Sequence, residues 1–353
     1  MSPEINDNHT SRRQFLKTSA AAAGAVMLTS SHERALAATP DDGKDYRNYQ
    51  PDRMKYQELG NTKLMASRLV FGCGAALAGG KAVRLLERSF AQGVNFYDVG
   101  YDDYYKGSEK HLAPFWKRHR DEIWVTSKAP ARVPGGGKLN ADKAKQAAAY
   151  WANQMDLSLQ RLETEYVDAY YYMGVSDPEL VQSEEMHNAF LAAKSAGKVG
   201  YLGISTHENA KECLEAATET GWFSVAMIAI TPSGWYDYRK RELLGEKGSL
   251  KDIKPILDKA KAAGIGICGM KAARPIAQQP YGAKYGTVDD ANPLDTFDKH
   301  YSPNFLKANL SPFQRSYAYC LENGVDVCNA DMQNFKHFEE NLIAARDSNI
   351  HYA

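Results

Sequence analysis

Eight short apolar segments rich in β-branched residues alternate with eight amphipathic helical segments from residue 68 onward. This alternation predicts βαβ units and a parallel sheet, because each helix returns the chain to start the next strand in the same direction. Eight units in roughly 290 residues favour a closed (β/α)8 barrel. The predicted strands lie at residues 68–73, 95–100, 123–129, 167–174, 199–205, 224–231, 264–271 and 325–329.

The connecting segments support the same α/β fold class, a TIM barrel. An open doubly wound sheet would need a phosphate-binding turn after its first strand, and FGCGAALAGG lacks the spacing G-x-G-x-x-G. Predicted helices lie at residues 82–92, 108–120, 142–163, 183–196, 208–220, 251–263, 310–323 and 335–346, and Ser311-Pro312 is a typical helix start.

Two further segments are expected outside the eight units. Gly60-Asn61 separates two alternating stretches in YQELGNTKLMASRLV, which predicts an N-terminal β-hairpin that caps the bottom of the barrel. The long loop after strand seven, residues 272–309, is polar and rich in Gly and Pro, and we expect a lid over the site rather than a disordered insertion. Its notable side chains are Arg274, Tyr281, Tyr285 and Tyr301.

The N-terminus reads as a targeting signal. The twin-arginine pattern SRRQFLK at residues 11–17 precedes a short apolar run, and Ala35-Leu36-Ala37 is a typical cleavage site, so we expect a Tat signal peptide over residues 1–37. The alternative is an amphipathic surface helix that begins with two arginines. Residues 38–54 are then a linker and residues 55–353 the barrel. The predicted partner is the Tat export machinery, the predicted location is the periplasm, and no later segment is apolar over about 18 residues as a membrane span would be.

Composition excludes some functions. The 43 Lys and Arg residues balance the 43 Asp and Glu residues, which argues against a nucleic-acid partner. The five cysteines form no CxxC pair, so we predict no metal site. A disulfide from Cys328 to Cys73 or to Cys268 is an alternative to free buried thiols, which we favour. We expect a monomer.

Two strand ends carry a charged pair. Barrel enzymes place their sites at the C-terminal ends of the strands, where Asp98 ends the second predicted strand and Lys128 ends the third. A lysine held beside an aspartate can lower the pKa of a nearby phenol. The alternative is an ion pair that only braces the barrel mouth.

The motifs GNTKLMASRLVFGCG, GVNFYDVGYDDYYKGSEKHL, VTSKA, SLQRLETEYVDAYYYM, VGYLGIST and HFEENL together resemble the aldo/keto reductase superfamily over residues 55–346. The resemblance implies hydride transfer between a nicotinamide cofactor, NADP or NAD, and a carbonyl or alcohol substrate without a metal. The substrate would be a small carbonyl or sugar-like molecule.

The resemblance also implies a catalytic set of aspartate, tyrosine, lysine and histidine. The aspartate falls on Asp98 and the lysine on Lys128. The tyrosine position falls on Asp103, so a one-residue slip would make Tyr104 the proton donor; Tyr105, Tyr101 or no phenol at all are the alternatives.

The histidine position falls on Met173, whose thioether cannot donate a hydrogen bond to a carbonyl. His207, just past the fifth predicted strand, is the candidate replacement. The alternative is that His207 caps the next helix or faces solvent.

Cofactor contacts are carried over in part. Ser205 and Thr206 match the residues that hold the nicotinamide, and Glu340 and Asn341 match the adenine-side pair. Asp331 and His337 stand where basic residues usually clamp the 2′-phosphate, which makes NAD(H) competitive with NADP(H). Lys271 and Arg274 could replace that clamp.

Three functions stay open from the sequence. A carbonyl reductase with a rearranged catalytic set is favoured over a lyase or isomerase that acts on a carbohydrate-like carbonyl, and over a non-catalytic ligand-binding protein. The many tyrosines at the expected mouth would suit a ring-shaped substrate. We expect Tyr171, in the fourth predicted strand, to pack under the helices instead.

Overall fold

The computed structural model describes residues 40–244, 248–277, 292–330 and 332–348, and within them eight parallel strands close into a barrel. The strands pair in the order β8, β11, β12, β3, β4, β5, β6 and β7, and the pairing of β7 with β8 closes the ring. The predicted fold is therefore confirmed. The strands are β3 (Leu69–Gly72), β4 (Phe96–Asp98), β5 (Trp124–Pro130), β6 (Val167–Met173), β7 (Val199–Thr206), β8 (Val225–Thr231), β11 (Gly266–Met270) and β12 (Val327–Ala330).

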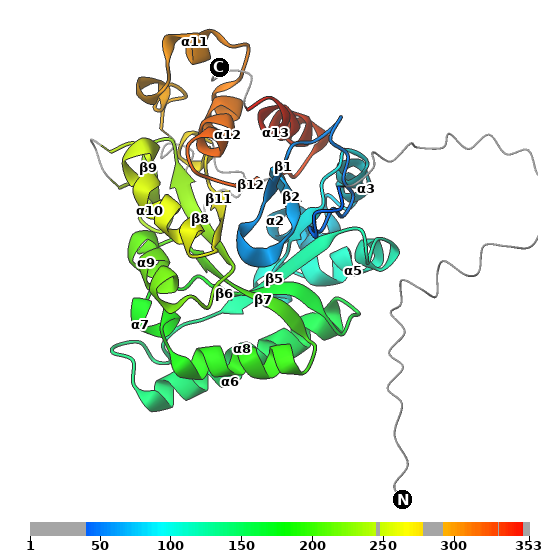
Figure 1. Cartoon of the computed structure of the whole chain (residues 1–353), viewed down its shortest axis with the longest axis vertical. Helices are drawn as coiled ribbons and strands as arrows, with labels where there is room; N and C mark the ends of the chain where they lie inside the picture. Colours follow the sequence, from blue (N-terminus) through cyan, green and yellow to red (C-terminus); the bar gives the residue numbers. More distant parts are fainter. Residues whose placement is uncertain (1–39, 245–247, 278–291, 331, 349–353) are drawn as a thin grey trace, which may run out of the picture. The chain divides into compact units, whose positions relative to one another are not determined.

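A long helix follows each barrel strand, and these helices surround the barrel (Figure 1). Side-chain caps fix several starts; the predicted cap at Ser311 is a full capping box, in which the Ser311 hydroxyl accepts the Gln314 N–H and the Gln314 side chain accepts the Ser311 N–H. The helices are α3 (Arg84–Ala91), α5 (Ser108–Arg118), α6 (Ala141–Arg161), α8 (Glu184–Ser195), α9 (Ala210–Thr220), α10 (Leu250–Ala262), α12 (Pro312–Glu322) and α13 (Phe335–Asp347).

The predicted hairpin covers the N-terminal end of the barrel. Strands β1 (Tyr56–Glu58) and β2 (Met65–Ser67) pair antiparallel around the 3-10 turn η1 (Gly60–Thr62). The Asn61 N–H donates to the carbonyl of Gly264, just before β11, over 2.8 Å. A Cβ atom on Gly60 would lie 2.4 Å from the backbone nitrogen of Gly266, so only glycine allows this approach.

The segment before the hairpin also contacts the barrel. Arg47 donates to the buried carboxylate of Asp168 over 2.7 Å and to the carbonyl of Ile123 over 2.9 Å. Asn48 donates to the carbonyls of Phe90 and Val94. Residues predicted as a linker therefore hold strand ends in place, and the domain boundaries at residues 37 and 54 stay predictions.

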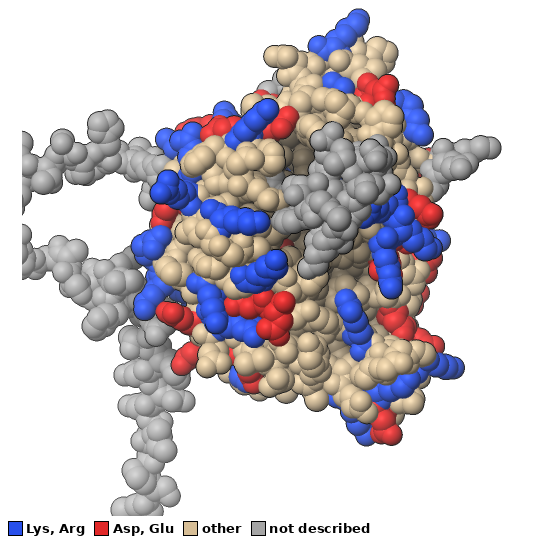
Figure 2. Space-filling model, turned by 180° about the vertical axis from the view of Figure 1, so that it is seen from behind, with Lys and Arg blue, Asp and Glu red and all other residues tan. Residues whose placement is uncertain are grey.

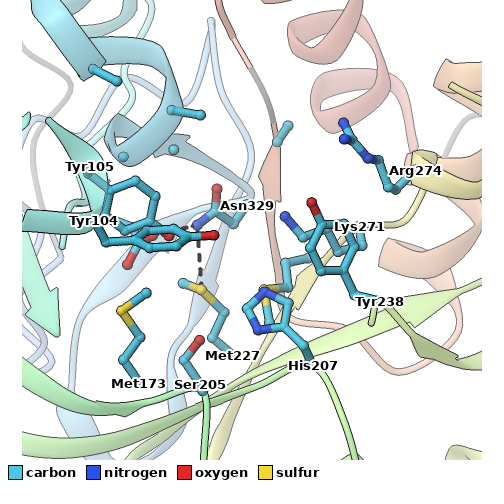
Figure 3. A pocket seen from close by; sticks show the side chains of 18 of the residues that line it. Tyr104, Tyr105, Met173, Ser205, His207, Met227, Tyr238, Lys271, Arg274 and Asn329 are labelled. Carbon is cyan, nitrogen blue, oxygen red and sulfur yellow. Dashed lines mark hydrogen bonds between the residues drawn. The ribbon is translucent and has the colours of Figure 1, made fainter. Parts of the chain in front are cut away.

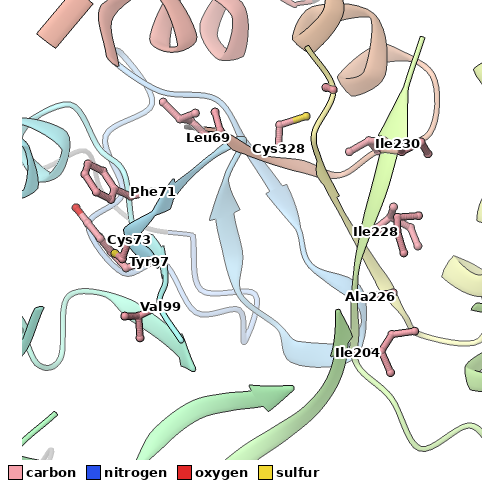
Figure 4. Packing of buried hydrophobic residues seen from close by; sticks show 14 of the residues in the cluster. Leu69, Phe71, Cys73, Tyr97, Val99, Ile204, Ala226, Ile228, Ile230 and Cys328 are labelled. Carbon is pink, nitrogen blue, oxygen red and sulfur yellow. The ribbon is translucent and has the colours of Figure 1, made fainter. Parts of the chain in front are cut away.

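Strand residues alternate between two apolar layers, as the period of a β-strand requires. Ala226, Ile228 and Ile230 of β8 belong to the layer between strands and helices, whereas Val225, Met227 and Ala229 belong to the barrel interior. Figure 4 shows outer-layer side chains of several strands on the face of the sheet that the helices cover. This alternation decides which strand-end side chains point into the mouth of the barrel.

Strand β6 corrects one prediction. Tyr170 and Tyr172 pack under α6, with ring centroids 5.3 and 5.1 Å from that of Trp151. Tyr171, which we expected under the helices, instead lies in the interior layer against Gly203, where a Cβ atom would stand 2.2 Å from its ring. The alternation was predictable, but its phase was assigned wrongly.

Short elements in the loops were missed from the sequence. They are α2 (Cys73–Leu77), η2 (Ala78–Gly80), α4 (Asp102–Tyr105), α7 (Pro178–Val181), η3 (Arg274–Ile276), η6 (Asp298–His300) and α11 (Pro303–Lys307), with a hairpin of β9 (Gly234–Asp237) and β10 (Glu242–Leu243) that pairs antiparallel with β8. Several of them line the mouth of the barrel.

The loop after β11 is only partly described. Tyr281 and Tyr285 lie outside the described residues. Tyr301 is buried against Phe305 and Tyr319, with centroid distances of 5.1 and 5.2 Å, and so packs with α11 and α12. The lid stays a prediction.

All five cysteines are buried free thiols. Among the described residues, no helix is long and apolar enough to cross a membrane. Figure 2 shows Lys and Arg interspersed with Asp and Glu over one face of the molecule, in keeping with the balanced charge of the chain.

Candidate active site

A cavity of about 1280 Å³ opens at the C-terminal ends of the barrel strands. It exceeds the roughly 300–1,000 Å³ of sites that hold one small ligand. Figure 3 shows Tyr104 and Tyr105 on one side, and His207, Tyr238, Lys271 and Arg274 on the opposite side. Ser205 and Met227 lie between these two walls, and Met173 lies below Tyr104 in this view.

A buried ion pair of Asp98 and Lys128 lines this cavity. Nζ of Lys128 lies 2.6 Å from both carboxylate oxygens of Asp98, and the two side chains are only 4% and 5% exposed. A third Lys128 hydrogen goes to the Val99 carbonyl, also over 2.6 Å. The structure therefore brings together the two strand-end residues that the sequence paired.

Two further side chains hold the Asp98 carboxylate. Thr126 donates to Oδ1 over 3.1 Å, and Asn329 donates to Oδ2 over 2.7 Å. Asn329 comes from β12 and reaches past β3, where Gly72 intervenes; a Cβ on Gly72 would lie 2.5 Å from Oδ1 of Asn329. We did not assign Asn329 to the site, and the glycine at the end of the neighbouring strand was the available signal.

The ring of Tyr105 packs beside the ion pair. Its ring lies between two glycines, because a Cβ on Gly74 or on Gly100 would lie 2.6 Å from opposite edges of the ring. Nζ of Lys128 lies 5.8 Å from the ring centroid. The half-exposed Tyr104 (48%) packs edge-on against Tyr105 with 4.8 Å between centroids. Tyr105, and not the predicted Tyr104, is therefore the ring that packs beside Lys128.

The helical turn α4 explains this register. Asp102 caps α5 by accepting the N–H of Glu109 over 2.7 Å, whereas Asp103 points outward to Arg161 at 3.1 Å. Each residue of a helical turn rotates the side-chain direction by about 100°. Tyr105 stands two residues after Asp103, the position that the resemblance gives to the tyrosine. The helical turn takes up these two residues and points Tyr105 back towards the ion pair, and Gly107 then precedes the first residue of α5.

The pKa of the Tyr105 phenol is raised well above its ordinary value, first by burial and second by the negative charge of Asp98. We expected Lys128 to lower that pKa. The expectation was wrong, because burial and the negative charge of Asp98 prevail and raise the pKa. Tyr105 is therefore a neutral phenol at neutral pH.

His207 lines the cavity, as the replacement for the missing histidine requires. Burial, then the positive charges of Lys271 and Lys128, lower its pKa to about 3. The imidazole is neutral at neutral pH and can donate one hydrogen bond. Met173 also lines the cavity, with 9% of its surface exposed.

The two cofactor residues predicted on β7, Ser205 and Thr206, point to opposite faces of the sheet, because successive side chains of a strand alternate. Ser205 points into the cavity, and its buried Oγ has no hydrogen-bond partner among the described residues. The next residue, Thr206, points away from the cavity and donates to the carbonyl of Glu208 over 2.6 Å. The structure therefore does not bring Thr206 to the site.

The remaining predicted residues lie around the rim. Lys271 and Arg274 stand over the ring of Tyr238, at 4.6 and 5.8 Å from its centroid. Glu340 and Asn341 of α13 also line the cavity. Asp331 lies outside the described residues. His337 on α13 also lines the cavity, and so do two residues missed from the sequence, Phe313 and Tyr317 on α12.

The aldo/keto reductase family model matches residues 70–344 of the chain, and the model of the twin-arginine translocation pathway signal sequence matches residues 9–29. "Uncharacterized oxidoreductase YqkF" from Bacillus subtilis is 29% identical over 156 residues, which cover 43% of this chain and 49% of that protein. Norsolorinic acid reductase B from Aspergillus parasiticus is 32% identical over 133 residues, which cover 35% and 33%. The chain thus spans half or less of the length of these two relatives.

Solved structures support the fold. An aldo-keto reductase from Bacillus halodurans has a TM-score of 0.57 and 21% identity, with 82% of this chain and 90% of that chain covered. A putative aldo-keto reductase from Pseudomonas aeruginosa has a TM-score of 0.56 and 19% identity, with 83% and 94% covered.

Proposed function

The chain belongs to the aldo/keto reductase family, and from that premise we propose that it is an oxidoreductase that reduces a small carbonyl compound with hydride from a nicotinamide cofactor. The observation that carries this proposal is the packing of the Tyr105 phenol against the buried pair of Asp98 and Lys128. That pair lies where barrel enzymes carry their chemistry.

Tyr105 donates the proton. A phenol whose pKa is raised keeps its proton at neutral pH and can transfer it to an oxygen that gains negative charge. The ammonium group of Lys128 stabilises that developing charge from a fixed position, because Asp98 and the Val99 carbonyl hold it in place. Asp98 in turn is held by Asn329 and Thr126.

His207 orients the substrate. A neutral imidazole donates one N–H to the carbonyl oxygen, which Met173 cannot do. Its depressed pKa keeps it in this neutral form through the physiological range. The side chain reaches the cavity from the loop after β7, whereas the residue it replaces would come from the end of β6.

The cavity residues fit a nicotinamide dinucleotide. The unpartnered Oγ of Ser205 can bind a carboxamide, and Lys271 and Arg274 supply positive charge for phosphates. Phe313 and Tyr317 add aromatic surface beside Glu340 and Asn341 for the adenine end. When bound, the cofactor supplies the hydride. The cofactor is NADH or NADPH, and His337 in place of a guanidinium weakens the preference for the 2′-phosphate.

We place the mature enzyme in the periplasm. The match to the twin-arginine signal supports export across the cytoplasmic membrane by the Tat machinery. That route carries folded proteins, so the cofactor would bind before export. The monomeric state stays a prediction.

Titration of the mature protein with NADH and with NADPH, followed by tryptophan fluorescence, tests cofactor binding. Reduction of a panel of aldehydes then tests the chemistry with two matched variants. We expect Tyr105→Phe to lower kcat by about 10²-fold or more with unchanged cofactor affinity, and Tyr104→Phe to keep most of the activity. Loss of activity in Tyr104→Phe alone would return the proton donor to Tyr104, and no binding of either cofactor would reject the proposal.

A further inference from the structure

The cavity carries an excess of positive charge. Among the described residues that line it, eight are Lys or Arg and three are Asp or Glu. The three carboxylates have partners: Asp98 binds Lys128, Glu208 lies 3.5 Å from Arg239, and Glu340 accepts a hydrogen bond from Ser311. A ligand in this cavity therefore meets a positive field, which focuses anions into a cleft.

The basic side chains form two groups. Lys271 and Arg274 belong to the wall opposite the tyrosines (Figure 3). Arg239 and Arg241, from the turn of the β9–β10 hairpin, also line the cavity, and we count them with this group. This first group suits the phosphates of a dinucleotide. The second group, Lys81, Lys106 and Arg132, comes from the loops after β3, β4 and β5, next to Tyr101, Tyr104 and Tyr105.

The second group is tied to the proton donor. Lys106 directly follows Tyr105, and its carbonyl accepts the Gly79 N–H over 3.0 Å, which joins the loop of Lys81 to it. Arg132 lies four residues after Lys128, and its positive charge acts on the Tyr101 phenol. These cations and Tyr105 therefore belong to neighbouring loops that line the same cavity.

The acidic residues closest in sequence to Lys106 form hydrogen bonds or ion pairs with residues outside this group. Asp103 binds Arg161. The buried Glu109 accepts a hydrogen bond from Ser127 and lies 3.8 Å from Arg161, and Asp102 accepts the N–H of Glu109 at the start of α5. The side chains of Lys106 and Arg132 are exposed at the rim. The planar guanidinium of Arg132 is suited to hold a carboxylate through two parallel hydrogen bonds.

We propose that the substrate is a carbonyl compound that carries a carboxylate, bound by Arg132 and Lys106 while its carbonyl group faces Tyr105. This inference rests on the proposed function and names its substrate class. The body of the substrate packs against Tyr101 and Tyr104, whose rings are nearly parallel with centroids 6.4 Å apart. The size of the cavity leaves room for this second ligand beside a cofactor.

A matched pair of aldehydes tests the proposal: 4-carboxybenzaldehyde and its neutral methyl ester, methyl 4-formylbenzoate. We expect kcat/KM to be at least about tenfold higher for the acid at low salt, and to fall with added salt for the acid alone. Arg132→Gln and Lys106→Gln should each raise KM for the acid several-fold and leave the ester unchanged. Lys110→Gln, an exposed α5 residue outside the cavity lining, is the control and should change neither.

Calorimetric binding of terephthalate, a non-reducible dicarboxylate, decides the same point without turnover. Binding that weakens about tenfold in Arg132→Gln supports the proposal. Equal kcat/KM for acid and ester, or terephthalate binding that is absent or unaffected in both variants, would overturn it. If neither aldehyde is reduced, the proposed function fails, and the terephthalate result still decides whether this wall binds carboxylates.

Discussion

The side-chain amide of Asn329 donates a hydrogen bond of 2.7 Å to Oδ2 of Asp98, a residue 231 positions earlier in the chain. The two come from β12 and β4, on either side of β3, and Gly72 leaves the space through which the amide passes. Asn329 is therefore a positioning residue that fixes the carboxylate and, through it, Lys128. A strand-end amide thus joins the last strand of the barrel to the second.

Removal of this amide should weaken both stability and catalysis. Asn329→Ala leaves the buried carboxylate of Asp98 with one hydrogen-bond donor fewer. We therefore expect a loss of about 1.5–3 kcal/mol in the free energy of unfolding. We also expect a lower kcat and a shift in the pH dependence of kcat. Asn323→Ala is the control, because Asn323 donates over 2.8 Å to the carbonyl of Tyr319, far from the reaction. Equal effects of the two variants on kcat would rule out the positioning role.

Removal of one partner of the buried ion pair between Asp98 and Lys128 should destabilise the folded protein. Lys128→Met leaves Asp98 charged and unpaired, which should cost about 3–5 kcal/mol of stability. The double variant Asp98→Asn/Lys128→Met removes both charges and should recover much of that loss, while activity stays low. Urea unfolding of the four proteins in this cycle measures the coupling. Simple additivity would mean that the two side chains do not interact as the distances indicate.

Gly100→Ala should displace the Tyr105 ring. The new methyl group would lie 2.6 Å from that ring and 3.2 Å from Cγ of Lys128. We expect a cost of about 1–3 kcal/mol and a fall in kcat of roughly tenfold or more. The loss of activity comes from the displaced Tyr105 ring. In a protein that already carries Tyr105→Phe, the further change Gly100→Ala should therefore leave kcat almost unchanged. If Gly100→Ala lowers kcat by the same factor in the Tyr105→Phe protein, its effect does not depend on Tyr105.

His207 predicts a pH-dependent stability. Its pKa is about 3 in the folded protein against an ordinary value of 6.5, so below pH 6.5 the unfolded chain binds a proton that the folded chain does not. Stability from this group is thus complete above about pH 6.5 and falls as the pH drops towards 3, by roughly 2 kcal/mol at pH 5. His207→Gln should remove this contribution, so its Tm should fall less between pH 7.5 and pH 5. If Tm falls equally with pH in His207→Gln and in the parent protein, the imidazole is solvated in the folded protein and its pKa is not lowered.

Export should depend on the arginine pair. Replacement of Arg12 and Arg13 by lysine keeps the charge but removes the twin-arginine pattern. We expect the variant to collect in the cytoplasm with its signal uncleaved, whereas the parent chain is recovered from the periplasm. Fractionation and mass measurement of the N-terminus distinguish the two, and cleavage after Ala37 would confirm the first domain boundary.

The sequence alone determined the architecture. Eight alternations of strand and helix predicted every barrel strand and every long helix within a few residues, because the hydrophobic period of each element is local information. The positions of Asp98 and Lys128 at adjacent strand ends followed from chain order and parallel pairing. The twin-arginine signal was readable without any fold.

Only the tertiary structure decided the fine assignment of the site. Tyr104 and Tyr105 are neighbours of the same type, and the helical turn α4 places the ring of Tyr105 between Gly74 and Gly100. The pleat of β7 turns Ser205 inward and Thr206 outward, and the pleat of β6 places Tyr171 inside the barrel. Asn329 reaches Asp98 only because the barrel closes. Loop register, pleat phase and contacts between distant strands depend on the packed whole, whereas strands and helices depend on their own residues.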